Sequence, residues 1–368
     1  MTARTRVVVL FGGRSAEHEV SCISAESVLR SLDSERYHVV PVGVTRDGEW
    51  VRSESADALV HSRQAAVGQP LVAAGSSLDR STVLTASSNT EEVDRVVVLP
   101  ILHGPFGEDG TVQGMLELAD VAYVGSGVLG SAVGMDKAIA KSVLATAGLP
   151  QAKWLARAAW DLATPSAVET FSAMVADLLA FPVFVKPANM GSSVGVTKAH
   201  DHAELISALS VALSFDDWVV VEQTIVGREI EFAVLGNEHP EVSVAGEILP
   251  GKEFYDYEDK YLGEGAQLVI PAALEPDVLA QGRHLALQAF RALRAEGMAR
   301  VDFFYDDRLD GMGWVVNEIN TIPGFTPISM YPKLWEASGV SYPQLLDRLI
   351  DLAIARHHRR SQRVGRPR

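Results

Sequence analysis

The sequence predicts an α/β protein whose first part folds as a doubly wound parallel sheet. Short runs rich in Val and Leu alternate with longer helical segments, and the runs are apolar nearly throughout, as in strands buried on both faces. The 368 residues also exceed the ~250–300 at which a single core stops growing, so two or three domains are expected. In the first part we expect strands at 6–11, 37–45, 94–99 and 121–125, and helices at 15–32 and 109–119.

Beyond a Gly-Ser-Gly boundary at 125–127, the chain is predicted to form two further units. The first opens with a helix that carries Met135-Asp136-Lys137 and ends at Gly148, because Gly followed closely by Pro is a common helix stop. Later strands are expected at 181–186, 218–222, 229–235, 242–248, 299–304 and 316–320, and helices at 275–295 and 342–356. We predict domains at 1–126 (with 51–93, weakly periodic and rich in Ala, Ser and Gly, as an insertion), 127–222 and 223–356, and a basic disordered tail at 357–368.

Composition limits what the protein does. The net charge of −15 argues against nucleic acid as the main partner, and the six arginines from Arg356 to Arg368 are interpreted as part of a solvated terminus. No run approaches the ~20 apolar residues of a membrane span, and the start lacks the features of a signal peptide. The single cysteine excludes an internal disulfide and fits a reducing compartment. We expect a cytoplasmic protein with neither a nucleic-acid nor a membrane partner.

The most informative segment is the pair of strands at 299–304 and 316–320. Side chains alternate along a strand, so Arg300 and Asp302 share one face, and Glu318 and Asn320 share another. If the strands pair as a hairpin, one cation and three oxygen ligands meet on a single patch. Carboxylate and amide oxygens without Cys or His suit Mg²⁺. A solvated sheet face with paired surface charges is the alternative for this segment taken alone.

Three segments are candidates for a nucleotide site. Lys186 ends a buried strand and opens a loop with two Gly and two Ser, whose backbone N–H groups can approach phosphate oxygens. Glu222 and Glu229 follow at a strand end, where carboxylates could accept from an adenine or a ribose. Residues 251–264 hold three Tyr and a Phe interleaved with charges, which is poor core material and suits a lid. Each segment alone is also compatible with an ordinary surface loop, and no Walker-type or dinucleotide fingerprint is present.

Two loops of the first part, at 12–19 and 103–110, follow strands, where ligands bind in open α/β sheets. Helix N-termini at such places favour a carboxylate ligand. His18 and His103 have no zinc-site spacing and suit loop histidines. After the second hairpin strand, Gly324 can turn a bare N–H toward an oxyanion.

Together these motifs resemble those of the D-alanine–D-alanine ligases, a family of the ATP-grasp superfamily. Six motifs occur in the family's order: GGRSAEHEVS, HGPFGEDG, MDK, FVKPANMGSSVGV, FYDYEDKY, and ARVDFF with NEINTIPGFTPISMYP. The resemblance extends from residue 11 to about 356, apart from 51–93. It implies a three-domain ATP-grasp architecture, α/β in the N-terminal domain and α+β in the ATP-grasp part, and a homodimer.

The resemblance implies a role for each matching position. ATP is contacted by Lys137, Lys186, Ser193, Glu222, Gln223, Ile225, Glu229 and Phe254, with the lysines at the phosphates. Two Mg²⁺ or Mn²⁺ ions are held by Asp302, Glu318 and Asn320. Substrates are positioned and deprotonated by Glu17, Ser192 and Tyr261, and their oxyanion is stabilised by Arg300 and Gly324. The two D-alanines are contacted by His103, Ser329 and Lys260.

The implied reaction joins two D-alanines through an acyl phosphate, consumes ATP and serves peptidoglycan precursor synthesis. The nearest alternative is a D-alanine–D-lactate ligase. In the family, the lid tyrosine goes with an amine acceptor, and the depsipeptide-forming enzymes differ at that position. Here the position is Tyr261, inside an intact FYDYEDKY, which favours D-alanine as the acceptor. Another ATP-grasp carboxylate–amine ligase and a nucleotide-binding sensor without turnover are further alternatives. The sensor is disfavoured because every matched position keeps a chemically competent residue.

Overall fold

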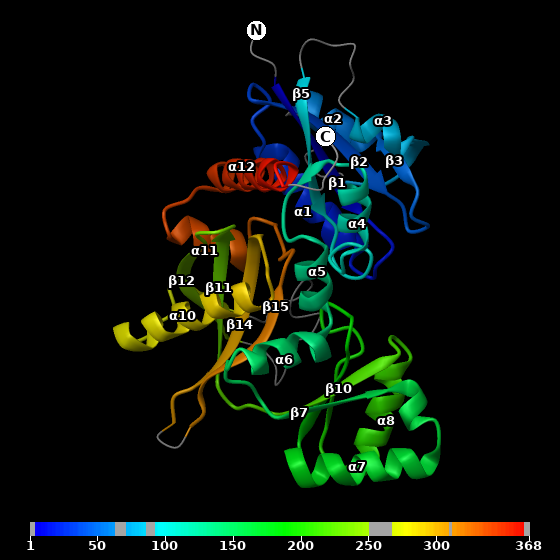
Figure 1. The fold of residues 1–368 in the computed structure, drawn as a ribbon, viewed down its shortest axis with the longest axis vertical. Helices are drawn as coiled ribbons and strands as arrows, with labels where there is room; N and C mark the ends of the chain where they lie inside the picture. Colours follow the sequence, from blue (N-terminus) through cyan, green and yellow to red (C-terminus); the bar gives the residue numbers. More distant parts are fainter. Residues whose placement is uncertain (1–3, 63–70, 86–92, 250–266, 309–310, 364–368) are drawn as a thin grey trace.

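The computed structural model describes residues 4–62, 71–85, 93–249, 267–308 and 311–363. These residues form a six-stranded, a four-stranded and a five-stranded sheet. Figure 1 shows the first sheet, in blue and cyan, at one end of the long axis and the four-stranded unit, in green, at the other. The five-stranded sheet, from green to orange, lies between them, so it can contribute to sites facing either neighbour.

The first sheet confirms the predicted parallel fold. Its main elements are β1 (Arg4–Gly12), α1 (His18–Ser31), β2 (Tyr37–Val44), β5 (Val93–Ile101), α4 (Thr111–Leu118) and β6 (Ala122–Tyr123). β1 is central and pairs in parallel with β2 and β5, and β5 pairs in parallel with β6. Val7, Val8 and Val9 are fully buried, as the unbroken apolar run predicts. The carboxyl end of β1 therefore delivers the loop that leads to α1.

The segment 51–93 holds regular structure that its weak periodicity concealed. Its described part belongs to β3 (Trp50–Ser53), α2 (Glu54–Ser62), β4 (Gly75–Ser77) and α3 (Arg80–Leu84). β3 pairs antiparallel with β2, and β4 with β3, so the segment extends the sheet at one edge. Trp50 and Ala56 are buried against the domain. Strands of three or four residues are too short to show a period.

The second unit is a four-stranded antiparallel sheet of order β7-β10-β8-β9. Its elements, with the two helices that lead to it, are α5 (Val128–Met135), α6 (Lys137–Thr146), β7 (Trp154–Ala158), η1 (Ala159–Leu162), α7 (Pro165–Leu179), β8 (Val183–Pro187), β9 (Thr197–Ala199), α8 (His202–Leu213) and β10 (Trp218–Gln223). The single helix predicted through residues 135–137 is wrong. Asp136 is extended, and its side chain accepts from the Ile139 N–H at 2.9 Å, which caps α6 and starts a second helix.

The third unit is an antiparallel sheet of order β13-β12-β11-β14-β15. Its elements are β11 (Arg228–Gly236), β12 (Glu241–Leu249), β13 (Gln267–Val269), α10 (Pro276–Ala292), β14 (Gly297–Asp306), β15 (Gly313–Asn320), α11 (Met330–Ala337) and α12 (Tyr342–Ser361). β14 and β15 form the predicted hairpin. Phe232, Phe303 and Trp314 pack between this sheet and α10, with ring centroids 5.4–5.8 Å apart. The short helix α11 was not predicted.

The prediction of a disordered tail from residue 357 is wrong as far as the structure describes it. α12 runs on to Ser361, past the predicted end at 356. Arg356 is 2% exposed and donates to the carbonyls of Tyr123 and Gly125. Arg360 forms ion pairs with Glu117 and Glu296. The basic side chains thus attach α12 to the first unit, beside which Figure 1 shows it in red.

The four-stranded unit joins the third sheet through two neighbouring segments. The carbonyl of Pro150 accepts from the N–H of Val316 on β15 at 2.9 Å. The N–H of Gln223, where the chain leaves the unit, donates to the carbonyl of Lys153 at 2.9 Å. The entering and leaving segments are therefore bonded to each other, and the entering one is also bonded to β15.

Candidate active site

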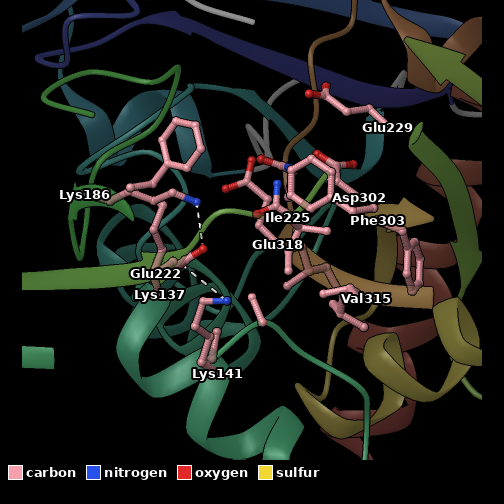
Figure 2. A pocket seen from close by; sticks show the side chains of 18 of the residues that line it. Lys137, Lys141, Lys186, Glu222, Ile225, Glu229, Asp302, Phe303, Val315 and Glu318 are labelled. Carbon is pink, nitrogen blue, oxygen red and sulfur yellow. Dashed lines mark hydrogen bonds and ion pairs between the residues drawn. The ribbon is translucent and has the colours of Figure 1, made fainter. Parts of the chain in front are cut away.

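A cavity of about 490 Å³ lies between the four-stranded and the five-stranded sheets. Figure 2 shows polar side chains from both sheets pointing into it around the apolar Ile225, Phe303 and Val315. Twelve predicted site residues line it: Lys137, Lys186, Ser192, Ser193, Glu222, Gln223, Ile225, Glu229, Arg300, Asp302, Glu318 and Asn320. A cavity with apolar walls and a few convergent charges is typical of a nucleotide or cofactor site.

The β14–β15 hairpin forms one wall. Arg300 lies opposite Asn320, and Asp302 opposite Glu318, so all four side chains share a face. The Arg300 guanidinium donates to both carboxylate oxygens of Asp302, each at 2.7 Å, and lies 2.8 Å from Glu231. Burial would lower the pKa of Arg300, but Asp302 and Glu231 outweigh it and raise that pKa well above its ordinary value. Arg300 is a fixed cation at this wall.

The hairpin ligands suit a hard divalent cation. Two carboxylates, Asp302 and Glu318, stand beside the amide of Asn320, which donates to Asp302 at 2.9 Å. Oxygen donors of this kind are those that Mg²⁺ and Mn²⁺ take. Among the described residues no group of three His, Cys, Asp or Glu side chains is placed to hold a metal, so such a site depends on the amide oxygen. Arg300 and Asn320 bond to the Asp302 oxygens, so a bound cation would share or replace these contacts.

A buried carboxylate and two lysines form the opposite wall. Glu222 lies 3.0 Å from Lys186 on β8 and 3.3 Å from Lys141 on α6. Burial acts to raise the pKa of Glu222, but the two lysines lower it to about 2. Burial lowers the pKa of Lys141, whereas Glu222 and Glu318 raise that of Lys186 despite its burial. Glu222 is therefore ionised at neutral pH.

The loop after β8 approaches the first unit closely. Ser192, Ser193 and Gly195 have φ of 48°, 59° and 72°, which bends the backbone into the left-handed region. A Cβ at Gly191 would lie 2.5 Å from a carboxylate oxygen of Glu17, so the backbone of this loop approaches that side chain closely. The Lys137 ammonium donates to the Met190 carbonyl at 2.5 Å. The structure therefore holds the predicted phosphate loop between α6 and the first unit.

Two predicted residues of the first unit lie beside this loop. The Ser192 hydroxyl donates to the carboxylate of Glu17, which joins the first and second units. The ring Nδ1 of His103 lies 3.1 Å from the Ile322 carbonyl, and Nε2 lies 3.3 Å from the Ser24 hydroxyl. Burial lowers the pKa of His103, so the ring is neutral with its proton on Nδ1.

Gly324 and Ser329 follow the hairpin but are not part of the cavity lining. Ser329 is the N-cap of α11, and its hydroxyl lies 3.1 Å from the Thr326 N–H. A Cβ at Gly324 would lie 3.1 Å from that hydroxyl, so the two predicted residues are neighbours. The predicted residues Phe254, Lys260 and Tyr261, with the whole candidate lid, lie outside the described residues.

Sequence reasoning missed four charged side chains of the cavity lining: Glu108, Lys141, Lys198 and Glu231. Lys141 lies one helical turn after Lys137, and Glu231 lies two residues after Glu229 on the same strand, so spacing could have indicated both. Glu108 belongs to a recognised motif and lines the cavity, where its carboxylate accepts from the Gly104 N–H at 2.8 Å. Burial and the charge of Glu17 raise the pKa of Glu108 to about 8.

Three units around one cavity, with a lysine-bearing phosphate loop facing an acidic hairpin, define an ATP-grasp architecture. The chain is similar over 98% of its length to the structure of a D-alanine–D-alanine ligase from Coxiella burnetii, with 36% identity and a TM-score of 0.81, covering 97% of that chain. It is also similar to the VanG D-Ala:D-Ser ligase from Enterococcus faecalis, with 34% identity, a TM-score of 0.78, and coverage of 95% and 99% of the two chains.

Sequence comparison identifies the family. Residues 6–126 match the D-ala D-ala ligase N-terminus and residues 143–351 the D-ala D-ala ligase C-terminus. Relatives named D-alanine–D-alanine ligase are 45% identical in Bacillus cytotoxicus and 48% identical in Kineococcus radiotolerans, each covering 96% of this chain and 97% of the relative. The chain belongs to the D-alanine–D-alanine ligase family.

Proposed function

We propose that this protein joins two D-alanine molecules into D-alanyl-D-alanine, with conversion of ATP to ADP and phosphate, for peptidoglycan precursor synthesis. The observation that carries the proposal is the hairpin register, which sets Arg300, Asp302 and Glu318 on one face of a cavity opposite Lys186 and Glu222. Membership of the D-alanine–D-alanine ligase family supports the choice of substrates.

The chemistry has two bond-forming steps. A carboxylate oxygen of the first D-alanine attacks the γ-phosphorus of ATP, the bond to ADP breaks, and an acyl phosphate forms. The deprotonated amine of the second D-alanine then attacks the acyl carbon, and inorganic phosphate leaves. Each step concentrates negative charge on oxygens, so fixed cations facing them contribute most.

The chain's residues divide this work. Lys137 and Lys186 bind phosphates, Glu222 and Glu229 accept from adenine and ribose, and Ser193, Gln223, Ile225 and Phe254 complete the nucleotide site. Asp302, Glu318 and Asn320 hold Mg²⁺ or Mn²⁺, which supplies positive charge to the phosphoryl oxygens.

The substrate residues surround the acyl carbon. Arg300 and the Gly324 N–H stabilise the tetrahedral oxyanion. Glu17, Ser192 and Tyr261 position the substrates and move the amine proton, and His103, Ser329 and Lys260 contact the D-alanines. The observed Glu17–Ser192 hydrogen bond supports this assignment, because it sets Glu17 of the first unit against Ser192 of the proposed phosphate loop.

Arg300→Ala tests the proposal. We expect D-alanine-dependent phosphate release to fall by at least about 10²–10³-fold, because an oxyanion donor is lost, while ATP still binds. Arg300→Lys keeps the charge without the two-pronged geometry and should recover only part of the rate. Near-normal turnover of Arg300→Ala would contradict the role of Arg300.

The second substrate needs its own test, because one similar structure bears the name of a D-Ala:D-Ser ligase. We expect D-alanine to be used in preference to D-serine and D-lactate at neutral pH. Product analysis with each acceptor across pH decides, and preferred use of D-lactate at neutral pH would support the depsipeptide alternative.

We also propose that the protein acts in the cytoplasm as a homodimer, without a nucleic-acid or membrane partner. The single cysteine and the net charge of −15 support this setting. No helix in the described ranges is long and apolar enough to cross a membrane. Sedimentation of the purified chain measures the oligomeric state, and a monomer at micromolar concentration would contradict the dimer.

A further inference from the structure

Two lysines share one buried carboxylate at the edge of the cavity. Lys141 lies 3.3 Å from one oxygen of Glu222, and Lys186 lies 3.0 Å from the other, as the two dashed lines in Figure 2 show. The side chains of Lys141, Lys186 and Glu222 are only 3%, 14% and 7% exposed. The cluster therefore sets two amines against a single buried carboxylate.

The two lysines differ in how they are held. Lys186 is the more exposed of the two, whereas the charge of Glu318 acts on both lysines. Lys141 stands on α6, whose Ala140 and Leu144 pack into the core of the five-stranded sheet, while Ala138 packs against Val220 of β10. The helix that carries Lys141 is thus held on two sides, whereas Lys186 ends a strand at the phosphate loop.

ATP presents a conflict to this cluster. If Lys186 binds a phosphate, as proposed above, it has to turn away from Glu222. A buried carboxylate without a cationic partner takes up a proton or draws its partner back, and either result weakens nucleotide binding. Lys141 removes the conflict because it already pairs with the other oxygen.

We propose that Lys141 is a positioning residue for the nucleotide: it stays paired with Glu222, and thereby keeps this carboxylate ionised and oriented toward adenine, while Lys186 moves to the phosphates. This inference rests on the proposed roles of Glu222 and Lys186. In this role Lys141 acts on the nucleotide through Glu222.

A double-mutant cycle on the full-length protein tests this. ATP binding is measured by calorimetry for wild type, Lys141→Met, Glu222→Gln and the double variant. We expect Lys141→Met to weaken ATP binding by about tenfold or more, as for coupled neighbouring residues. In the Glu222→Gln background the same substitution should weaken ATP binding by less than about threefold further. Lys141→Arg should stay near wild type, and Lys141→Gln replaces Lys141→Met in the cycle if the latter does not fold.

Inosine triphosphate adds a readout that general damage would not move. It carries a carbonyl where adenine carries an amino group, so it lacks the amino N–H from which Glu222 is proposed to accept. We expect Lys141→Met to lower the preference for ATP over inosine triphosphate, whereas a merely structural defect would weaken both nucleotides equally.

Lys198→Met is the matched control, because it removes another lysine from the cavity wall. Its effect should be the same in the wild-type and Glu222→Gln backgrounds. If Glu222→Gln binds ATP as wild type does, the proposed nucleotide role of Glu222 fails. Two other outcomes overturn only the positioning role of Lys141, provided that Glu222→Gln weakens ATP binding. In the first, Lys141→Met leaves ATP binding unchanged. In the second, Lys141→Met weakens ATP binding equally in the wild-type and Glu222→Gln backgrounds.

Discussion

Glu108 shows how burial sets the protonation of a single side chain. It is 8% exposed, its carboxylate accepts from the Gly104 N–H, and the charge of Glu17 acts on it. Burial and the charge of Glu17 raise the pKa of Glu108 to about 8, from an ordinary pKa of 4.5. Between these two pH values the folded protein keeps a proton on Glu108 that the unfolded chain has released. This contribution to stability is complete below the unfolded pKa and is lost as pH rises through 8.

Glu108→Gln should remove this pH dependence, because the amide oxygen still accepts from Gly104 and carries no charge. The wild type should lose this stability as pH rises, and the variant should not. We therefore expect the difference in free energy of unfolding, variant minus wild type, to increase by roughly 3–5 kcal/mol between pH 5 and pH 9. Denaturant unfolding of the ligand-free protein at several pH values measures it, with Glu26→Gln, whose side chain is 30% exposed, as the control. A difference that does not change with pH would contradict a raised pKa.

At this scale the hairpin residues were predictable from local spacing, whereas Lys141 and Glu108 were not. Arg300, Asp302 and Glu318 share a face because strands alternate, which is a local rule. Lys141 and Glu108 acquire their properties from segments far away in the chain, on β10 and in the first unit. Local spacing shows where such a side chain starts but not what surrounds it.

Among the elements, α10 packs closely on the sheet that forms the hairpin wall. Gly282 allows this approach, since a Cβ there would lie 2.6 Å from Trp314 and 2.8 Å from Phe232. Both rings belong to the aromatic cluster behind β14. The helix therefore supports the wall from the face opposite the cavity.

Gly282→Ala should crowd this contact and lower the free energy of unfolding by about 1–3 kcal/mol, since overpacking outweighs the gain in helix propensity. Gly114→Ala in α4 is the matched control, because no atom lies within 4 Å of its Cβ position, and it should stabilise by up to about 1 kcal/mol. Thermal unfolding of both variants checks this. Equal effects would contradict the packing argument.

Most elements were predictable because each carries its own period, and the failures have physical causes. The helix predicted through residues 135–137 is two helices, because Asp136 caps a new one. The hydrophobic pattern does not indicate such a cap. The end of α12 was misplaced because a run of arginines looks solvated until its partners are known. The lid at 251–264 and the variability of the insertion at 51–93 stay predictions.

Across the whole molecule, α12 joins the last unit to the first. Arg356 lies with its guanidinium 4.3 Å from the ring centroid of Tyr123 and donates to two backbone carbonyls of the first unit. Arg359 and Arg360 both pair with Glu296, at 2.7 and 2.6 Å. The relative placement of the first and third units therefore depends on the C-terminal helix.

Arg356→Met should lower the free energy of unfolding by about 2–4 kcal/mol, because it leaves two buried carbonyls without donors. Arg348→Met, also on α12, breaks an exposed ion pair with Glu241 and should cost less than about 1 kcal/mol. Thermal unfolding and hydrogen exchange of β6 measure both. Similar losses for the two variants would show that α12 does not hold the units together.

The two neighbouring connections of the four-stranded unit also determine how that unit can move. Since the segments at Lys153 and Gln223 are bonded to each other, and Pro150 to β15, the two chain connections lie side by side at one end of the unit. Glu222 lies next to these connections, whereas the loop carrying Ser192 lies at the far end of β8, where it is bonded to Lys137 of α6 and to Glu17. A rotation of the unit about its connections would shift Glu222 little and the Ser192 loop most, and it would have to break the hydrogen bonds of this loop to Lys137 and Glu17. With the nucleotide roles proposed above, the site for the base would stay in place while the site for the phosphates opens or closes.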